Sequence, residues 1–164
     1  MNEPGGGGSA IKLIGIGQSL RGDDGAGSAA IRLWQERYGK ASDRPGLEVA
    51  LAEAPGIGLL DMLEGARFAI LVDAVRSDAR PGTIHLLSAD QLAAFTSGSG
   101  SAHGWGVAET LALGKQLMPG EMPGKLYLIG IEAGDVSLGE SLSPEVELAL
   151  AEAACLIEQL ISKD

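Results

Sequence analysis

One apolar run limits the fold of this chain more than any other feature: "RFAILVDAV", from Arg67 to Val75. Hydrophobic side chains follow one another through its middle without polar alternation, which is typical of a strand buried on both faces. Shorter runs of the same kind occur in "AIKLIGI", "LEVALAEA", "TIHLLSA" and "KLYLIGIEA". Segments with helical spacing separate most of these runs. The pattern predicts an α/β fold of three layers, in which helices cover both faces of a twisted, largely parallel sheet.

Four segments carry the pattern of helices. They are "GAGSAAIRLWQERYG", the short "GIGLLDMLEGA", the stretch from about Gly106 to Leu117, and a long final segment. Ser143 and Pro144 open the last of these with the form of an N-cap and a first helical residue. We expect residues 1–9 to be a flexible glycine-rich tail and residues 10–164 to form a single domain.

The composition sets limits on partners and compartment. The net charge is −10, with 45% hydrophobic and 21% charged residues, so neither nucleic acid nor an anionic membrane is the expected partner. No apolar run reaches the length of a membrane span, and the start lacks the pattern of a signal peptide. The single Cys155 excludes an intramolecular disulfide and a zinc site of several cysteines, and we expect it to pack in the core. A cytoplasmic location fits these features.

The glycine-rich segment "GIGQSLRGDDGAG" raises the question of whether it binds phosphate or presents acids. Leu20 occupies the third glycine position of a dinucleotide fingerprint, and no lysine followed by serine or threonine forms a P-loop. Asp23 and Asp24 would repel a phosphate at the start of the following helix. They could simply cap that helix, which stabilises by about 0.5–2 kcal/mol. Capping accounts for one of the two carboxylates, but it explains less well why the second is present.

Two further residues stand where a ligand could bind. Asp73 follows a buried apolar run directly, and His103 precedes a predicted helix. Together with Asp24 they could form a set of three metal ligands with open positions. The alternative is that Asp24 starts a helix, Asp73 caps a turn and His103 is exposed. A Ser-His-Asp enzyme is disfavoured, because "GSGSAHG" lacks the strand and spacing of a nucleophile elbow; we expect His85 to be structural or exposed.

Four motifs in this order resemble those of the nickel–iron hydrogenase maturation endopeptidases. "GIGQSLRGDDGAG" is similar to the first loop of that family, with Gln18 in place of the usual asparagine. "LVDAV" carries the aspartate of the third strand, and "SAHGWGVAETL" carries the histidine before a helix. "GIEAGDVSLGESLSPEVELAL" is similar to the family's last loop and helix, with Ala133 in place of a proline. The resemblance extends from Ala10 to the final helix.

The resemblance implies a function and a set of site residues. A member of this family removes the C-terminal extension of a hydrogenase large-subunit precursor after nickel has been inserted. Asp24, Asp73 and His103 match the family's metal-binding positions, and we expect them to be both catalytic and metal-binding. The nickel is supplied by the precursor, so no tightly bound intrinsic cofactor is expected. Gln18 and Ala133 are departures that could alter the fit of the substrate.

Two other functions remain as alternatives at this point. The protein could be a non-catalytic, nickel-dependent checkpoint or chaperone that binds the same precursor without cutting it. It could also be a small-ligand or nucleotide-binding α/β module, which the acidic loop disfavours. The residues do not decide whether a metal ion or a carboxylate would activate the nucleophile.

Overall fold

The computed structural model describes residues 10–39, 43–96, 106–139 and 141–164. The strands are β1 (Ala10–Ile16), β2 (Leu47–Ala52), β3 (Ala66–Val75), β4 (Ile84–Ser88) and β5 (Lys125–Glu132). The helices are α1 (Ala26–Tyr38), α2 (Leu59–Leu63), α3 (Ala89–Thr96), α4 (Val107–Leu117) and α5 (Pro144–Ser162). Short 3-10 turns at Gly22–Gly25 and Gly56–Gly58 lead into α1 and α2. The tail expected at residues 1–9 lies outside the described residues.

The five strands form one sheet in the order β2-β1-β3-β5-β4. The pairs β1–β2, β1–β3 and β3–β5 are parallel, and only β4 runs antiparallel, against β5. This confirms the predicted largely parallel sheet. The run that suggested a doubly buried strand is β3, which lies in the centre and has seven consecutive buried residues from Phe68 to Ala74.

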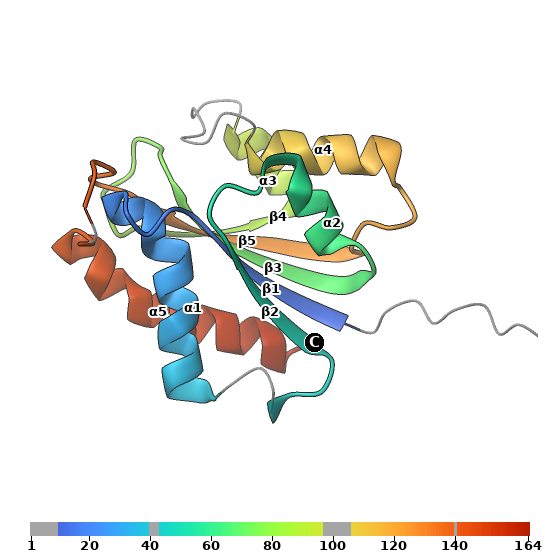
Figure 1. The fold of residues 1–164 in the computed structure, drawn as a ribbon, viewed down its shortest axis with the longest axis horizontal. Helices are drawn as coiled ribbons and strands as arrows, with labels where there is room; N and C mark the ends of the chain where they lie inside the picture. Colours follow the sequence, from blue (N-terminus) through green and yellow to red (C-terminus); the bar gives the residue numbers. More distant parts are fainter. Residues whose placement is uncertain (1–9, 40–42, 97–105, 140) are drawn as a thin grey trace, which may run out of the picture.

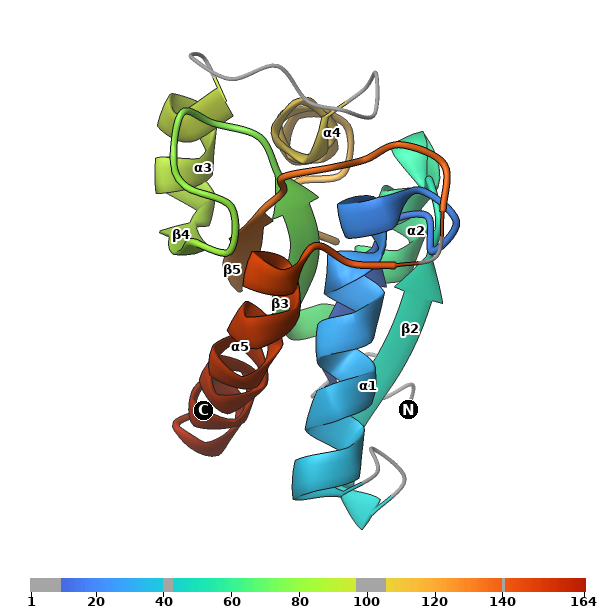
Figure 2. The same ribbon diagram turned by 90° about the vertical axis from the view of Figure 1, so that its left-hand side faces the viewer.

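Helices cover both faces of the sheet, as predicted (Figure 1). On one face α1 and α5 lie side by side, and their side chains share a core with alternate residues of β3 such as Phe68 and Ile70 (Figure 2). On the other face α2, α3 and α4 share a second core with Ala69 and Leu71. Because successive side chains of a strand point to opposite faces, Asp73 faces the same side as Ala69 and Leu71.

Two expectations need correction. The sequence analysis assigned no helix to Ala89–Thr96, where α3 follows β4 directly. Leu92 of α3 is buried in the second core, and a helix of two turns is too short to show a long hydrophobic period in the sequence. Cys155 is partly exposed on α5 rather than packed in the core. No helix within the described ranges is both long and apolar enough to cross a membrane.

Candidate active site

The carboxyl ends of β1 and β3 form the topological switch point of the sheet. The chain passes from β1 to β2 on one side and then returns to β3 on the other side of β1. Ligands of open α/β sheets bind in the crevice outside the strand ends at such a point. The loop after β1 carries Asp24, and Asp73 is the third-last residue of β3, which ends at Val75. Two of the three predicted site residues therefore lie at this edge of the sheet, Asp24 in the loop after β1 and Asp73 near the end of the strand β3 itself.

Glycines allow the loop after β1 to fold tightly around Asp24. Gly17 has a φ of 135°, and a Cβ at this residue would collide with the carbonyl oxygen of Asp24. A Cβ on Gly27, in the first turn of α1, would collide with the carbonyl oxygen of Val72. The small residues thus let the loop close on itself and let α1 approach the end of β3. They position a carboxylate rather than cradle a phosphate.

Asp24 and Asp73 form a buried pair of like charges. Their exposed fractions are 3% and 5%, and Oδ2 of Asp24 accepts a hydrogen bond of 2.8 Å from the backbone N–H of Gln18. Burial raises the pKa of Asp73 well above its ordinary value, and the charge of Asp24 raises it further against a hydrogen bond from the backbone of Ala74. Two such carboxylates favour a bound proton or a bound cation, because either one removes the repulsion.

Asp23 has a different role from its neighbour. Its side chain is fully buried, and its carboxylate accepts four hydrogen bonds from the segment between β5 and α5. The donors are the backbone N–H groups of Gly134, Asp135 and Ser143 and the hydroxyl of Ser143, at 2.6 to 2.9 Å. Burial opposes ionisation, but the hydrogen bonds from Asp135, Ser143 and Gly134 outweigh it and lower the pKa of Asp23. Asp23 therefore fastens the first loop of the chain to the last one.

The two aspartates do not cap a helix by hydrogen bonding, although both lie in the first turn of the 3-10 helix that leads into α1. Neither the 3-10 turn at Gly22–Gly25 nor α1 has a side-chain hydrogen bond at its N-terminus. Ser143 does precede Pro144 at the start of α5, as predicted, but its hydroxyl donates to Asp23 instead of capping the helix. The two adjacent carboxylates thus have different partners, because Asp23 binds the segment before α5 whereas Asp24 binds Gln18 within its own loop.

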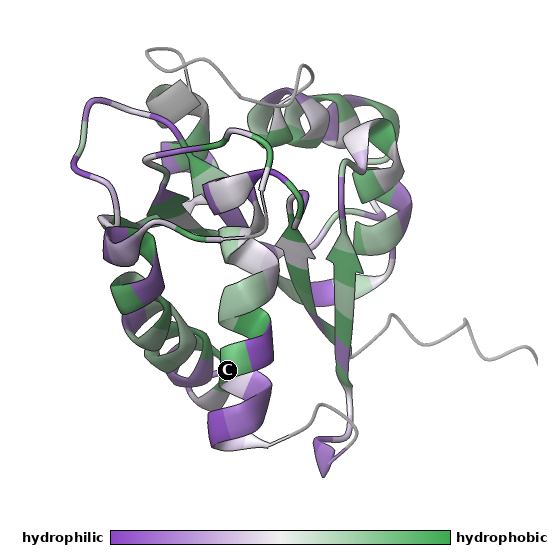
Figure 3. Cartoon of the chain, turned by 60° about the vertical axis from the view of Figure 1, so that its left-hand side comes forward, coloured by the Kyte–Doolittle hydropathy of each residue, from purple (hydrophilic) through white to green (hydrophobic). Residues whose placement is uncertain are grey.

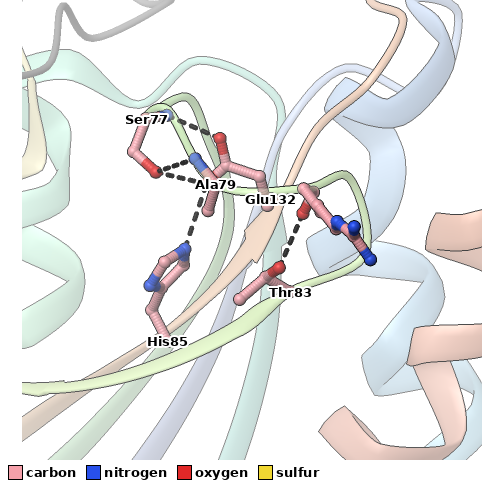
Figure 4. A network of polar contacts seen from close by, with 6 residues as sticks. Ser77, Ala79, Thr83, His85 and Glu132 are labelled. Atoms are coloured by element: carbon pink, nitrogen blue, oxygen red, sulfur yellow. Dashed lines mark hydrogen bonds and ion pairs between the residues drawn. The ribbon is translucent and has the colours of Figure 1, made fainter.

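A further buried acid, Glu132, lies at the end of β5 and organises the loop between β3 and β4 (Figure 4). It is 1% exposed and accepts hydrogen bonds from the backbone N–H of Ser77 at 2.6 Å and from its hydroxyl at 2.8 Å. Nε2 of His85 lies 3.0 Å from Oε2 of the same carboxylate. This confirms the structural interpretation of His85. The sequence analysis missed Glu132 as a site-forming residue, although an acid at the end of an apolar run was the signal that identified Asp73.

The two departures from the family motifs are explained in part by backbone contacts. Gln18 binds Asp24 through its backbone N–H, so this bond does not depend on the side chain at that position. The backbone N–H of Ala133 donates to the carbonyl of Val75 at 2.9 Å, a bond that a proline could not make. The residue at this position therefore adds one hydrogen bond between β5 and the end of β3.

The buried ionisable side chains of the described residues are all acids. Asp23, Asp24, Asp73 and Glu132 are buried near the carboxyl end of the sheet, and none of the described lysines or arginines is buried. Figure 3 shows the hydrophobic strands leading into loops that contain hydrophilic segments. His103 lies outside the described residues, and among the residues that are described no three acidic, histidine or cysteine side chains are grouped as a metal site.

Comparisons with known proteins agree with this fold and these motifs. The family model "hydrogenase maturation protease" of the HycI type matches residues 38–160. HupD of Thiocapsa roseopersicina, a hydrogenase expression/formation protein, is 30% identical over 84% of this chain, which spans only 61% of the length of HupD. The hydrogenase 2 maturation protease of Escherichia coli is 28% identical over 93% of this chain and 88% of that protein.

Solved structures show the same architecture. The hydrogenase maturation protease HybD of Thermococcus kodakarensis is 26% identical with a TM-score of 0.74, over 92% of this chain and 98% of that one. HybD of E. coli shares the fold with a TM-score of 0.82 at 24% identity, over 94% of this chain and 93% of that chain. The comparisons thus define a peptidase built on an open α/β sheet. More narrowly, the chain belongs to the hydrogenase maturation protease family.

Proposed function

We propose that this protein is an endopeptidase that removes the C-terminal extension of a nickel–iron hydrogenase large-subunit precursor after nickel insertion. The observation that supports this most is the buried pair of Asp24 and Asp73 at the switch point. A cation brought by the substrate would relieve the repulsion between them. In this proposal Asp24, Asp73 and His103 bind the nickel of the precursor and thereby form the catalytic site.

The donor set suits this role chemically. Two carboxylates and one imidazole match a divalent transition metal of intermediate hardness. Three protein ligands leave positions open for groups of the precursor, so binding would require a loaded precursor. In the cleavage itself a water adds to the carbonyl carbon, the C–N bond breaks and the leaving amine takes up a proton. We propose that the protein carries no tightly bound cofactor of its own and that it acts in the cytoplasm.

Selectivity for the loaded precursor follows from the charges. The protein has a net charge of −10 and its buried charges at this edge are acidic. A nickel-free precursor that presents its own metal ligands would meet Asp24 and Asp73 without a cation between them. Each 1.4 kcal/mol of lost interaction corresponds to about tenfold in affinity, so the nickel-free form should not be cut.

The test is tail removal from purified precursor, followed by mass spectrometry. Nickel-loaded and nickel-free precursors are compared side by side with the wild-type protein and with the variants Asp24→Asn, Asp73→Asn and His103→Ala. We expect cleavage only of the loaded form and only by the wild type. Glu152→Gln, which changes an exposed acid on α5, is the matched control and should cut normally.

A non-catalytic checkpoint is the alternative. It predicts that the wild-type protein binds the loaded precursor and leaves its tail intact at all enzyme concentrations. Equal cleavage of loaded and nickel-free precursor would instead indicate a peptidase that reads sequence alone. A variant that folds and still processes at the normal rate would remove the substituted residue from the proposed site.

A further inference from the structure

Two loops from opposite ends of the chain are joined along their backbones next to the proposed site. The N–H of Gly22 donates to the carbonyl of Gly139 at 2.8 Å, and the N–H of Gly139 donates to the carbonyl of Leu20 at 2.9 Å. The N–H of Asp23 donates to the carbonyl of Asp135 at 2.8 Å. Figure 2 shows the segment before α5 running along the segment before α1. Together with the carboxylate of Asp23, these bonds fix the two loops as one paired unit.

This paired unit carries two exposed leucines at matching backbone positions. A parallel bridge joins Arg21 to Gly139, so Leu20 and Leu138, each one residue earlier, are neighbours across the pairing. Leu20 is 58% exposed and Leu138 is 83% exposed. Neither leucine belongs to one of the two hydrophobic cores. Single exposed leucines are common on protein surfaces, but two at matching positions of paired loops offer apolar surface that the hydrophobic cores do not use.

The position of these leucines relates them to the proposed chemistry. Leu20 lies four residues before Asp24 in the same loop after β1, so a protein substrate that reaches Asp24 also comes near Leu20. The acids of this edge are at most 5% exposed, so they can meet a cation but offer little surface to the rest of a protein substrate. Affinity for the remainder of the substrate therefore has to come from exposed side chains around the site, and Leu20 and Leu138 are the large apolar ones on these two loops.

We propose that Leu20 and Leu138 form an apolar docking patch for the hydrogenase precursor, contacting a hydrophobic side chain on its surface beside the extension that is removed. This inference rests on the proposed function and specifies how that same site recognises its substrate. The patch acts on binding and takes no part in bond cleavage. Its loss should raise KM and leave kcat unchanged.

The experiment compares Leu20→Ser and Leu138→Ser with Leu148→Ser in cleavage of the nickel-loaded precursor. Leu148, on the outer side of α5, is 82% exposed and so matches Leu138 in chemistry and exposure. Burial of a leucine side chain is worth enough that each patch variant should raise KM about tenfold. Leu148→Ser should have the KM of the wild type, and Leu138→Met, which keeps an apolar side chain, should retain most of the affinity for the precursor. All variants should have the melting temperature of the wild type, because these side chains are exposed.

The outcomes separate this inference from the proposed function. Unchanged KM values for Leu20→Ser and Leu138→Ser would overturn the docking patch while the wild type still cleaves. A fall in kcat at constant KM would also overturn it, since the leucines would then act on loop geometry. If the wild type does not cleave at all, the proposed function fails, and surface-immobilised precursor measures binding directly. Equal dissociation constants for wild type, Leu138→Ser and Leu148→Ser would then overturn the patch as well.

Discussion

The substitution Asp23→Asn tests the distinction between the two adjacent aspartates. Asparagine has nearly the shape of aspartate, so the change removes charge and one acceptor while it preserves packing. Oδ2 of Asp23 accepts hydrogen bonds from Gly134, Asp135 and the hydroxyl of Ser143, and Oδ1 accepts one of 2.6 Å from the N–H of Ser143. If asparagine keeps its carbonyl oxygen where Oδ2 of Asp23 was, its NH2 group takes the place of Oδ1 and faces the N–H of Ser143. A buried donor then faces another donor.

The expected magnitude follows from these contacts. A hydrogen bond to a charged group contributes about 1.5–3 kcal/mol, and a buried donor left unsatisfied costs about 1–3 kcal/mol. We therefore expect Asp23→Asn to lower the free energy of unfolding by about 3 kcal/mol at neutral pH. For a chain of this size the melting temperature should fall by about 6–12 °C.

The matched control is Asp24→Asn, one residue further along the chain. Its side chain is also buried, but it lies beside the carboxylate of Asp73, which its charge destabilises. Asparagine can still accept the hydrogen bond from the N–H of Gln18 while it removes the repulsion. Asp24→Asn should therefore be as stable as the wild type, or more stable, and inactive in precursor cleavage.

Urea unfolding followed by circular dichroism measures both variants, and an unchanged m-value shows that the unfolded states are comparable. Losses of equal size in the two variants would refute the division of roles. So would an Asp23→Asn protein whose free energy of unfolding stays within about 0.5 kcal/mol of the wild type, the usual effect of a surface substitution.

Three further predictions concern the other acids and the metal. The pKa of Asp73 is raised in the folded state, so ionising this carboxyl opposes folding, and wild-type stability should increase as pH falls from neutral through the raised pKa toward the unfolded pKa. Asp73→Asn should be more stable than the wild type at neutral pH and should flatten this pH dependence, which urea unfolding at a series of pH values measures. Glu132→Gln should lower the free energy of unfolding by about 2–4 kcal/mol, because it disrupts the buried bonds to Ser77 and His85; a loss below about 0.5 kcal/mol, measured in the same way, would contradict this. Isothermal titration of the free protein with nickel should show no tight site, since the proposed shell is completed only by the precursor, and a stoichiometric nanomolar site that survives dialysis would indicate an ordinary metalloprotease instead.

Much of the fold and part of the site could be predicted from local features. The uninterrupted apolar run of β3 was sufficient to predict a strand buried by helices on two faces. Asp24 and Asp73 could be expected near one another because one comes after an apolar run and the other ends one, and the carboxyl ends of parallel strands share one edge. The antiparallel direction of β4 and the short helix α3 left no comparable pattern in the sequence.

The role of Asp23 could not be predicted in this way. Its partners are three backbone N–H groups and one hydroxyl, 111 to 120 residues away. Any residue except proline can supply a backbone N–H, so the partner segment carries no residue type that identifies it. Two neighbouring aspartates in a glycine-rich loop look alike in the sequence, and only the tertiary structure separates them.

The bond between Asp23 and Ser143 has a consequence for the order in which the molecule is assembled. The loop that carries Asp24 is made early on the ribosome, whereas its anchor is 120 residues further along the chain. Contacts of such long sequence separation form late, because the entropy of closing the intervening chain must be overcome first. In a nascent chain the loop that carries Asp24 therefore lacks its hydrogen bonds to the segment before α5 until α5 has been synthesised and has docked beside α1.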